Sequence, residues 1–401
     1  MSDDKFQWTE WRLGHPLTIN RIVWDEQEFE RIREVFMRDW FGPSWYAGAL
    51  ENRLADFIGR DHAQLVNSGS SALLLATQGL QAQRRWAKGD LILHPACTFP
   101  TSCNPIYLAG MTPAFVDVEE GTYNIDMDGA WSALVRYPEI KGAIIPHLLG
   151  NSPKIDELKA LLGDRPLIED CCDTLGGKYA GKMVGSFGDA AAFSFYASHH
   201  ITTAGVGGAL LMDDPELYRL VHSMTFWGRE FTESGDPYTD FTNRYTYSTV
   251  GHDMQITEVQ AAFGLAQFDR LAGMNRQRAE QFRKTHDFFR QWEYWLVLPR
   301  SHPEAEPSWF GYPVLVKEDA PFDREAFARH LLDHRVEIRP LFTGNITRQP
   351  AYKNLRRVVV GALTQSDHNM ERAFFLPAWG GMTDEMTDYL FDVVRDFMGK
   401  W

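Results

Sequence analysis

The sequence predicts an α/β protein in which a large domain, built on a mostly parallel sheet, is followed by a smaller α+β domain. Between residues 63 and 212, apolar runs of strand length alternate with helical or turn-rich stretches, which is typical of parallel strands joined by crossover helices. A chain of 401 residues also exceeds the size that one hydrophobic core usually serves. We place the boundary near Leu271, which gives domains at residues 1–271 and 272–401.

The strands of the large domain are expected where short apolar runs end in turn residues. Each run is brief and apolar throughout, as strands buried on both faces are. The expected strands cover residues 63–66, 91–95, 112–118, 142–146, 166–170, 190–195 and 208–212.

The helices are expected where apolar residues recur with helical spacing or where strong helix formers cluster. In the large domain these segments are 26–40, 50–58, 72–81 and 257–271, and a long charged helix follows at 276–292. Beyond it the pattern changes, and the smaller domain is expected to hold strands at 312–316 and 336–339 and helices at 323–333 and 383–398.

The charge balance excludes two classes of partner. A formal net charge of −14 argues against a nucleic-acid surface and against an anionic-membrane surface, because both reward clustered Lys and Arg.

No stretch of about 18 uninterrupted apolar residues is present. Residues 1–6 show no basic region followed by an apolar core, so we expect a cytoplasmic protein without a leader.

The cysteines point to neither a disulfide scaffold nor a metal centre. The four, Cys97, Cys103, Cys171 and Cys172, are too few and too irregularly spaced for either. We expect buried free thiols and no metal site.

A Gly/Ser turn stands where the first strand of the large domain gives way to a helix. In Asn67-Ser-Gly-Ser-Ser71, the backbone N–H groups around Gly69 and the hydroxyls of Ser70 and Ser71 would converge at the positive end of that helix. Such a turn can hold a phosphate group. The same residues also suit an ordinary helix N-cap, and the turn alone does not decide between the two.

Two carboxylates follow the strand expected at 166–170. Asp170 ends this strand, and Asp173 comes three residues later. A carboxylate at the end of a buried strand can hydrogen-bond a protonated ring nitrogen, but it is also a common turn residue.

The most informative stretch runs from Ser194 to His199, continues with His200 and ends in a glycine-rich segment at 204–208. A strand, a serine, a histidine pair and a glycine-rich turn in succession single out His199. Ser194 can donate to a phosphate, and Phe99, which follows another strand, can stack on a ring. Taken singly, each of these residues is more often structural, and His200 fits that reading.

In order and approximate spacing, these segments resemble the nucleotide-sugar aminotransferases of the DegT/DnrJ/StrS family over essentially the whole chain. The resemblance includes the turn at 67–71, the Glu169-Asp170 pair, the segment 194–199 and Glu258-Val-Gln-Ala-Ala-Phe-Gly264. It implies the aspartate-aminotransferase fold, which is pyridoxal-phosphate fold type I. It also implies a homodimer with the active site at the subunit interface.

The segment His199-His-Ile-Thr stands where the family has its cofactor-binding lysine. In this it is similar to the family's 3-dehydratases of 4-keto-6-deoxy sugars, among them GDP-4-keto-6-deoxymannose 3-dehydratase and CDP-4-keto-6-deoxyglucose 3-dehydrase. An imidazole has no primary amine with which to hold the cofactor aldehyde. The resemblance therefore implies pyridoxamine or pyridoxal 5'-phosphate bound noncovalently, with His199 as the catalytic base.

The CDP-sugar enzymes add an iron–sulfur cluster held by four cysteines downstream of the histidine. No cysteine follows Cys172 here, and such a cluster requires thiolate ligands. We therefore expect no iron–sulfur cluster, and the GDP-sugar enzymes are the better match.

The resemblance also assigns roles to the residues singled out above. Asp170 would hold the pyridine nitrogen, Asp173 would reach the phenol oxygen, and Phe99 would stack on the ring. A carboxylate beside a phenolate needs a proton or a donor between them. The phosphate would be held by Gly69, Ser70, Ser71 and Ser194.

The implied reaction removes the C3 hydroxyl of a nucleotide-linked 4-keto-6-deoxyhexose and releases a 4-keto-3,6-dideoxy sugar and ammonia. An amino donor such as glutamate would then restore the amine form of the cofactor. In this scheme His199 removes a proton from the cofactor, and the same imidazole can protonate the leaving hydroxyl.

One position departs from the family pattern. Gly251-His-Asp253 stands where family members usually have Gly-Tyr-Asn, whose asparagine reaches across the dimer to the cofactor phosphate. We place Asp253 in the cofactor site, although a carboxylate beside a phosphate is repulsive unless it is protonated or bridged by a cation.

A nucleotide diphosphate on an acidic protein calls for planar cationic donors. The substrate contacts are therefore sought among Arg229, Arg244, Arg339 and Asn345. Any single arginine of this set also fits an ordinary surface ion pair.

Two other interpretations stay open from the sequence. One is a lysine-less aminotransferase that makes an amino sugar, with His199 moving the proton. The other is a cofactor-binding protein without catalysis, although no DNA-binding module or basic face accompanies the fold.

Overall fold

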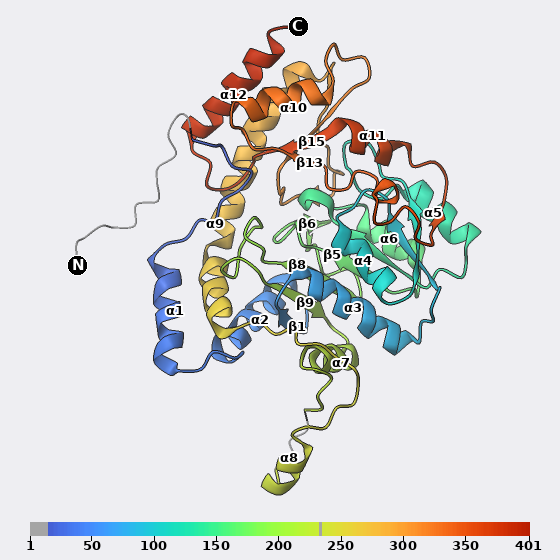
Figure 1. Cartoon of the computed structure of the whole chain (residues 1–401), viewed down its shortest axis with the longest axis vertical. Helices are drawn as coiled ribbons and strands as arrows, with labels where there is room; N and C mark the ends of the chain where they lie inside the picture. The colour runs from blue at the N-terminus through green and yellow to red at the C-terminus, as the bar shows by residue number, and fades with distance from the viewer. Residues whose placement is uncertain (1–14, 232–234) are drawn as a thin grey trace, which may run out of the picture.

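The computed structural model describes residues 15–231 and 235–401. Residues 1–6, on which the expectation of a leaderless chain rests, lie outside these ranges. Figure 1 shows a central sheet covered by helices, a smaller unit at one end of the long helix α9 (Glu258–Phe289), and α8 (Pro237–Asn243) projecting from the opposite end of the molecule. No helix within the described residues combines the length and the apolar character needed to cross a bilayer.

The central sheet, as far as the chain is described, has eight strands in the order β1-β9-β8-β5-β4-β2-β3-β14. Neighbouring strands are parallel, except that β9 runs antiparallel to both β1 and β8. The strands are β1 (His62–Val66), β2 (Leu91–Pro95), β3 (Thr112–Val116), β4 (Gly142–Pro146), β5 (Leu167–Asp170), β8 (Ala190–Ser194), β9 (Gly208–Met212) and β14 (Val358–Val359).

The seven strands predicted for the large domain are confirmed at or near their expected bounds. The two-residue β14 was not predicted. It comes from the C-terminal third of the chain and pairs with β3 at the edge of the sheet. A run this short has no periodicity by which a sequence pattern could identify it.

Helices cover both faces of this sheet because its strands are apolar on both sides. In β8, Phe193 packs in a core cluster with α2 and α9, while Ala192 packs in another with α3 and α7. In the first two-thirds of the chain the helices are α1 (Glu26–Arg38), α2 (Trp45–Ile58), α3 (Gly69–Arg84), α4 (Pro100–Leu108), α5 (Met127–Arg136), α6 (Ile155–Leu162), α7 (Pro215–Thr225), α8 and α9.

The prediction of two helices at 257–271 and 276–292 is wrong, because α9 runs through both without a break. Gly273 lies in the intervening stretch, and a mid-helix glycine costs only about 1 kcal/mol. Apolar packing on both sides of it outweighs that cost, since Leu271 lies in the core of the large sheet and Phe288 in the core of the smaller unit. The domain boundary predicted near Leu271 falls within α9, and the division at this residue stays a prediction.

The smaller unit packs helices against a four-stranded antiparallel sheet in the order β10-β12-β15-β13. Its elements are β10 (Leu296–Val297), β12 (Tyr312–Val316), α10 (Arg324–Asp333), β13 (Arg339–Pro340), α11 (Thr364–Arg372), β15 (Ala373–Leu376) and α12 (Asp384–Met398). A three-stranded sheet of β11 (Ala305–Glu306), β6 (Lys178–Tyr179) and β7 (Lys182–Met183) and the 3-10 turns η1 (Leu148–Gly150), η2 (Arg290–Trp292) and η3 (Ile346–Arg348) complete the described elements.

The strand predicted at 336–339 forms only in part. Arg339 pairs with β15, whereas Val336 makes a parallel bridge with Leu17. Leu17 is buried in the core of the smaller unit. Val336 thus pairs with the chain near residue 17, and the residues that follow Leu17 continue to the cavity of the large domain.

Candidate active site

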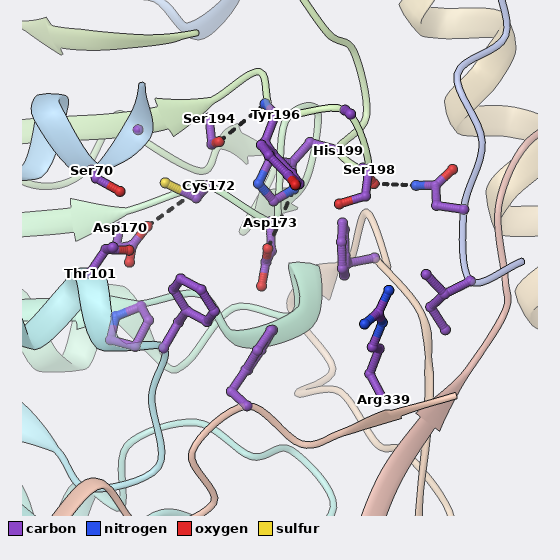
Figure 2. A pocket seen from close by; sticks show the side chains of 18 of the residues that line it. Ser70, Thr101, Asp170, Cys172, Asp173, Ser194, Tyr196, Ser198, His199 and Arg339 are labelled. Atoms are coloured by element: carbon purple, nitrogen blue, oxygen red, sulfur yellow. Dashed lines mark hydrogen bonds and ion pairs between the residues drawn. The ribbon is translucent and has the colours of Figure 1, made fainter. Parts of the chain in front are cut away.

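A cavity of about 830 Å³ opens at the ends of β5 and β8, next to the first turns of α3 and α4. Segments far apart in the sequence line it, including residues 18–22 and β13 of the smaller unit. Figure 2 shows Ser70, Asp170 and Ser194 on one side of this space and Arg339 on the other. A volume of this size suits a cofactor together with part of a substrate.

The first turn of α3 forms one wall. Ser68 caps the helix by accepting the backbone N–H of Ser71, and the exposed Ser70 faces the cavity. Ser71 is turned away, since its hydroxyl donates to the side chain of Asn67 at 2.6 Å, and it does not line the cavity. The uncapped N–H groups of this turn remain available to an anion.

Gly69 allows this turn to lie directly against the sheet. A Cβ at position 69 would stand 2.7 Å from the Cβ of Ser194 and 2.8 Å from the Sγ of Cys172. Real side chains essentially never approach so closely, so glycine is required here for packing. This contact brings the start of α3 next to Ser194 and to the end of β5.

Asp170 stands at the carboxyl end of β5 and is held there by two hydrogen bonds. The hydroxyl of Ser102, in the first turn of α4, donates to one carboxylate oxygen, and the backbone N–H of Cys172 donates to the other at 3.1 Å. The carboxylate is buried yet lines the cavity. It can therefore offer an oriented negative charge to a ring nitrogen.

A buried network beneath the cavity fixes the strand that carries Asp170. Glu169 accepts the backbone N–H groups of Phe187 at 2.8 Å and Gly188 at 2.6 Å, and it pairs with Nε2 of His147 at 3.0 Å. Burial works to raise the pKa of Glu169, but the hydrogen bond to His147 and the other donors hold this pKa below its usual value. The network thus anchors β5 and the cavity wall at His147 together.

His199 and Asp173 face each other in the cavity, with Nδ1 of His199 3.7 Å from a carboxylate oxygen of Asp173 (Figure 2). Nδ1 is buried and has no hydrogen-bond partner among the described residues, so a small rotation would bring the two groups into hydrogen-bond distance. None of the described residues that line the cavity is a lysine. The position next to Asp173 therefore offers an imidazole and no primary amine.

Burial shifts the pKa values of these two groups in opposite directions. It raises the pKa of Asp173 to about 7, and the nearby charge of Asp170 adds to that rise. It lowers the pKa of His199 to about 3, with the buried guanidinium of Arg278 adding to that fall. Between these values the proton lies on the carboxyl group and the imidazole is neutral, which is the form a general base needs.

Three more of the predicted site residues lie in the cavity. Phe99 is 48% exposed there and packs edge-on against Phe342, with ring centroids 5.7 Å apart. Ser194 accepts the backbone N–H of Tyr196 at 3.3 Å, and Arg339 pairs with Glu337.

Besides Ser71, four predicted residues lie outside the cavity. Asp253 is exposed and accepts the amide of Gln255, and Arg244 is exposed just after α8. Arg229 lies over the ring of Phe231 at 5.3 Å. Asn345 is buried, and its side chain is occupied by hydrogen bonds to Asp367 and Thr347.

Sequence reasoning missed several lining residues, among them Asn20, Arg21, Thr101, Ser102 and Cys172. Ser102 and Cys172 stand close to the predicted Phe99 and Asp170, so proximity in sequence was an available signal for both. Asn20 and Arg21 had none, because only the chain path through Leu17 brings them to the cavity.

Solved structures match the whole fold. The chain matches GDP-4-keto-6-deoxymannose-3-dehydratase (ColD) in a histidine-to-asparagine mutant with bound GDP-perosamine, with a TM-score of 0.87 and 27% identity over 94% of this chain and 100% of that one. It matches the same enzyme with a trapped PLP-glutamate geminal diamine with a TM-score of 0.86 and 28% identity over 94% and 99% of the two chains. The predicted fold, pyridoxal-phosphate fold type I with a large α/β domain, is confirmed.

Curated relatives also match over nearly the full length. The lipopolysaccharide biosynthesis protein RfbH of Salmonella typhimurium is 35% identical over 93% of this chain and 90% of its own. The dTDP-4-dehydro-2,6-dideoxy-D-glucose 3-dehydratase of Saccharopolyspora spinosa is 34% identical over 96% and 87%. Because the model of the DegT/DnrJ/EryC1/StrS aminotransferase family matches residues 23–395 as well, the chain belongs to that family.

Proposed function

We propose that this protein is a pyridoxamine-phosphate-dependent 3-dehydratase that removes the C3 hydroxyl of a nucleotide-linked 4-keto-6-deoxyhexose. The observation that carries the proposal is His199, which faces the cavity beside Asp173, where no lysine lies among the described lining residues. The 34% identity to a named nucleotide-sugar 3-dehydratase and the structural match to ColD support dehydration rather than transamination.

The cavity residues fit the cofactor. The N–H groups at the start of α3, with Ser70 and Ser194, suit its phosphate, and the buried carboxylate of Asp170 suits its pyridine nitrogen. Phe99 offers a partly exposed ring for stacking. When bound, the cofactor supplies an amine that joins the sugar ketone and a ring that accepts electrons.

Asp173 suits the phenol oxygen of the cofactor because of its protonation. With a pKa raised to about 7, this carboxyl retains its proton in mildly acidic to neutral solution. It can then donate a hydrogen bond where an ionised carboxylate would repel. This removes the conflict that the sequence alone left at Asp173.

His199 carries the proton through the reaction. Its neutral imidazole accepts a proton from the C4′ carbon of the cofactor, and the resulting imidazolium protonates the oxygen of the departing C3 hydroxyl. Nδ1 faces Asp173, so we assign both transfers to Nε2. Asp173 then stabilises the transient positive charge.

We propose that Arg339 binds the phosphate groups of the substrate. It projects into the cavity from the smaller unit, opposite Ser70 (Figure 2), and Arg21 lines the same cavity. Planar guanidinium groups suit a diphosphate. GDP-perosamine bound to the similar ColD supports a nucleotide sugar as the ligand.

We further propose a homodimer in which Arg229, Arg244 and Asp253 serve the partner's cavity. All three lie outside the cavity of their own chain, and Arg244 and Asp253 are exposed. The interface position that the family resemblance implies for the Asp253 segment supports this assignment. Asn345, with its buried and occupied amide, is proposed to act on substrate only through the loop it caps.

Glutamate is proposed as the amino donor, supported by the PLP-glutamate adduct trapped in ColD.

The cytoplasm is proposed as the compartment. Four free cysteines, three of them buried, suit a reducing environment. The buried thiols have raised pKa values, about 12 for Cys97, which disfavours the thiolates that an iron–sulfur cluster would need.

The decisive experiment incubates the cofactor-loaded protein with a panel of nucleotide-linked 4-keto-6-deoxyhexoses and glutamate. Dehydration yields a 4-keto-3,6-dideoxy sugar with free ammonia, whereas transamination yields an amino sugar. An amino sugar as the main product would reject the proposal in favour of the aminotransferase. No turnover of any substrate, with the cofactor bound, would favour the non-catalytic alternative.

A further inference from the structure

We propose that His330, His334 and Asp396 form a surface site for a borderline divalent cation such as Zn²⁺, which links α10 to α12. His330 lies on α10 and His334 directly follows it, one helical turn on, with ring centroids 4.3 Å apart. Asp396 on α12 lies beside this pair, with a carboxylate oxygen 3.6 Å from Nε2 of His330, and the proposed ligand atom of His330 is its other nitrogen, Nδ1. One ligand atom from each of the three residues lies within 4.8 Å of the other two.

Each of the two imidazole rings already makes a hydrogen bond to a backbone carbonyl, as the rings of metal-bound histidines commonly do. Nε2 of His330 lies 3.0 Å from the carbonyl of Val393, and Nδ1 of His334 lies 2.8 Å from the carbonyl of His330. A carbonyl only accepts, so these two nitrogens carry the hydrogens. Each ring therefore keeps a lone pair on its other nitrogen, and a hydrogen bond from the non-ligating nitrogen to a carbonyl is typical of metal-bound histidine.

A side-chain cation of the protein itself already occupies this position. Nζ of Lys400 lies 3.5 Å from Nδ1 of His330 and 3.4 Å from a carboxylate oxygen of Asp396. The ammonium thus sits between two of the three ligand groups. Lys400 is exposed near the end of the described chain, so it can swing into solvent when a divalent ion enters.

The donor set favours a zinc-like ion. Two imidazole nitrogens and one carboxylate oxygen, with water in the fourth position, are a ligand set that Zn²⁺ accepts. Mg²⁺ and Ca²⁺ prefer oxygen ligands throughout.

The site lies apart from the proposed active site. Figure 1 shows α10 and α12 side by side beyond the smaller sheet, and none of the three ligands lines the cavity. A bound ion would tie the last turn of α12 to α10. The sequence expectation of no metal site rested on the cysteines, and these three residues meet only in the folded chain.

The test measures Zn²⁺ binding to the cofactor-loaded protein by equilibrium dialysis and by thermal melting. We expect one saturable Zn²⁺ that His334→Gln weakens at least about tenfold, as loss of metal-site partners does. Zn²⁺ should raise the melting temperature of the wild type and not that of the variant. His334 is exposed, so the variant should fold, and His368→Gln, at a surface histidine paired with Glu318, is the matched control.

Lys400→Met gives an independent test, because it removes the competing ammonium while leaving all three ligands. It should tighten Zn²⁺ binding. Equal Zn²⁺ affinity in the wild type and in His334→Gln, or weaker binding in Lys400→Met, would overturn the proposal. These measurements need no sugar turnover, so their outcome is separate from that of the proposed dehydratase function.

Discussion

At the scale of single residues, the chemistry depends on where one proton resides. His199 and Asp173 lie 3.7 Å apart, and burial favours the neutral form of both. A neutral imidazole beside a protonated carboxyl can accept a proton from carbon and still have a partner for the charge that follows. The pair therefore combines a base with a hydrogen-bond partner for its other ring nitrogen.

His199→Asn should abolish turnover and keep cofactor binding. General-base catalysis contributes about 10²–10⁴-fold, so the rate should fall by at least about two orders of magnitude. Single-turnover assays and cofactor absorbance after gel filtration measure the two effects. His200→Asn is the control, because His200 bonds the carbonyl of Ser308 and does not line the cavity. Normal turnover in His199→Asn would disprove the assignment.

The titrations of Asp173 and His199 should also change the stability of the fold with pH, in opposite directions. The pKa of Asp173 is raised from 3.8 to about 7, so its stabilising contribution is present below pH 3.8 and is lost as the pH rises to about 7. The pKa of His199 is lowered from 6.5 to about 3, so its contribution is present above pH 6.5 and is lost as the pH falls toward 3. Between pH 3.8 and 6.5 the two titrations change the free energy of unfolding in opposite directions, so their effects cancel in the wild type.

In each single variant, the pH dependence of the free energy of unfolding should reflect the titration of the residue that remains. In Asp173→Asn the free energy of unfolding should fall on acidification below pH 6.5, by up to about 1.4 kcal/mol per pH unit. In His199→Asn it should fall instead as the pH rises from about 4 to 7. Urea unfolding of the cofactor-free proteins at several pH values tests this. Slopes of the same sign in both variants would contradict it.

At the scale of elements, the site is built from the ends of helices and strands. The start of α3 lies against the ends of β5 and β8 because Gly69 has no Cβ. The strand predictions from apolar runs were confirmed here. The structure places the predicted Gly69, Ser70, Asp170 and Ser194 around one cavity, and their role as cofactor-binding residues stays a prediction. Ser71 was placed in the same turn, but its hydroxyl is used within the helix start.

Gly69→Ala should separate α3 from the sheet. The new methyl group would clash with Ser194 and Cys172, which should destabilise the fold by about 1–3 kcal/mol and weaken phosphate binding. Gly48→Ala, in α2 with nothing within 4 Å of the added Cβ, is the matched control and should be neutral or stabilising by up to about 1 kcal/mol. Denaturation midpoints and cofactor titrations compare the two. Equal cofactor affinity in both variants would refute the packing argument.

At the scale of the whole molecule, one region projects with its apolar groups uncovered. Figure 1 shows α8 projecting from the rest of the molecule. The helix has no buried residue, and Tyr238, Phe241 and Tyr245 are 73%, 71% and 76% exposed. Three large aromatic side chains in one exposed segment are typical of an interaction surface. We read this as the surface of the proposed homodimer.

Phe241→Asp combined with Tyr245→Asp should therefore shift the protein from dimer to monomer and reduce turnover, because a charge placed in an apolar interface is not compensated. Sedimentation velocity measures the shift. Tyr294→Asp alters another exposed aromatic residue, in the smaller unit, and should change neither quantity. A wild type that sediments as a monomer while fully active would rule out an active site shared between subunits.

The sequence by itself determined the fold class, the predicted strands of the large sheet and the residues at their ends, because buried strands and glycine-rich turns leave local patterns. The family resemblance also implies that His199 stands where a lysine would tether the cofactor, and this assignment stays a prediction. Only the tertiary structure decided that α9 is one helix, that the chain near Leu17 leads Asn20 and Arg21 to the cavity, and that His330, His334 and Asp396 meet. These features depend on contacts between segments distant in sequence, and the pKa values of Asp173 and His199 depend on burial, which no local pattern encodes.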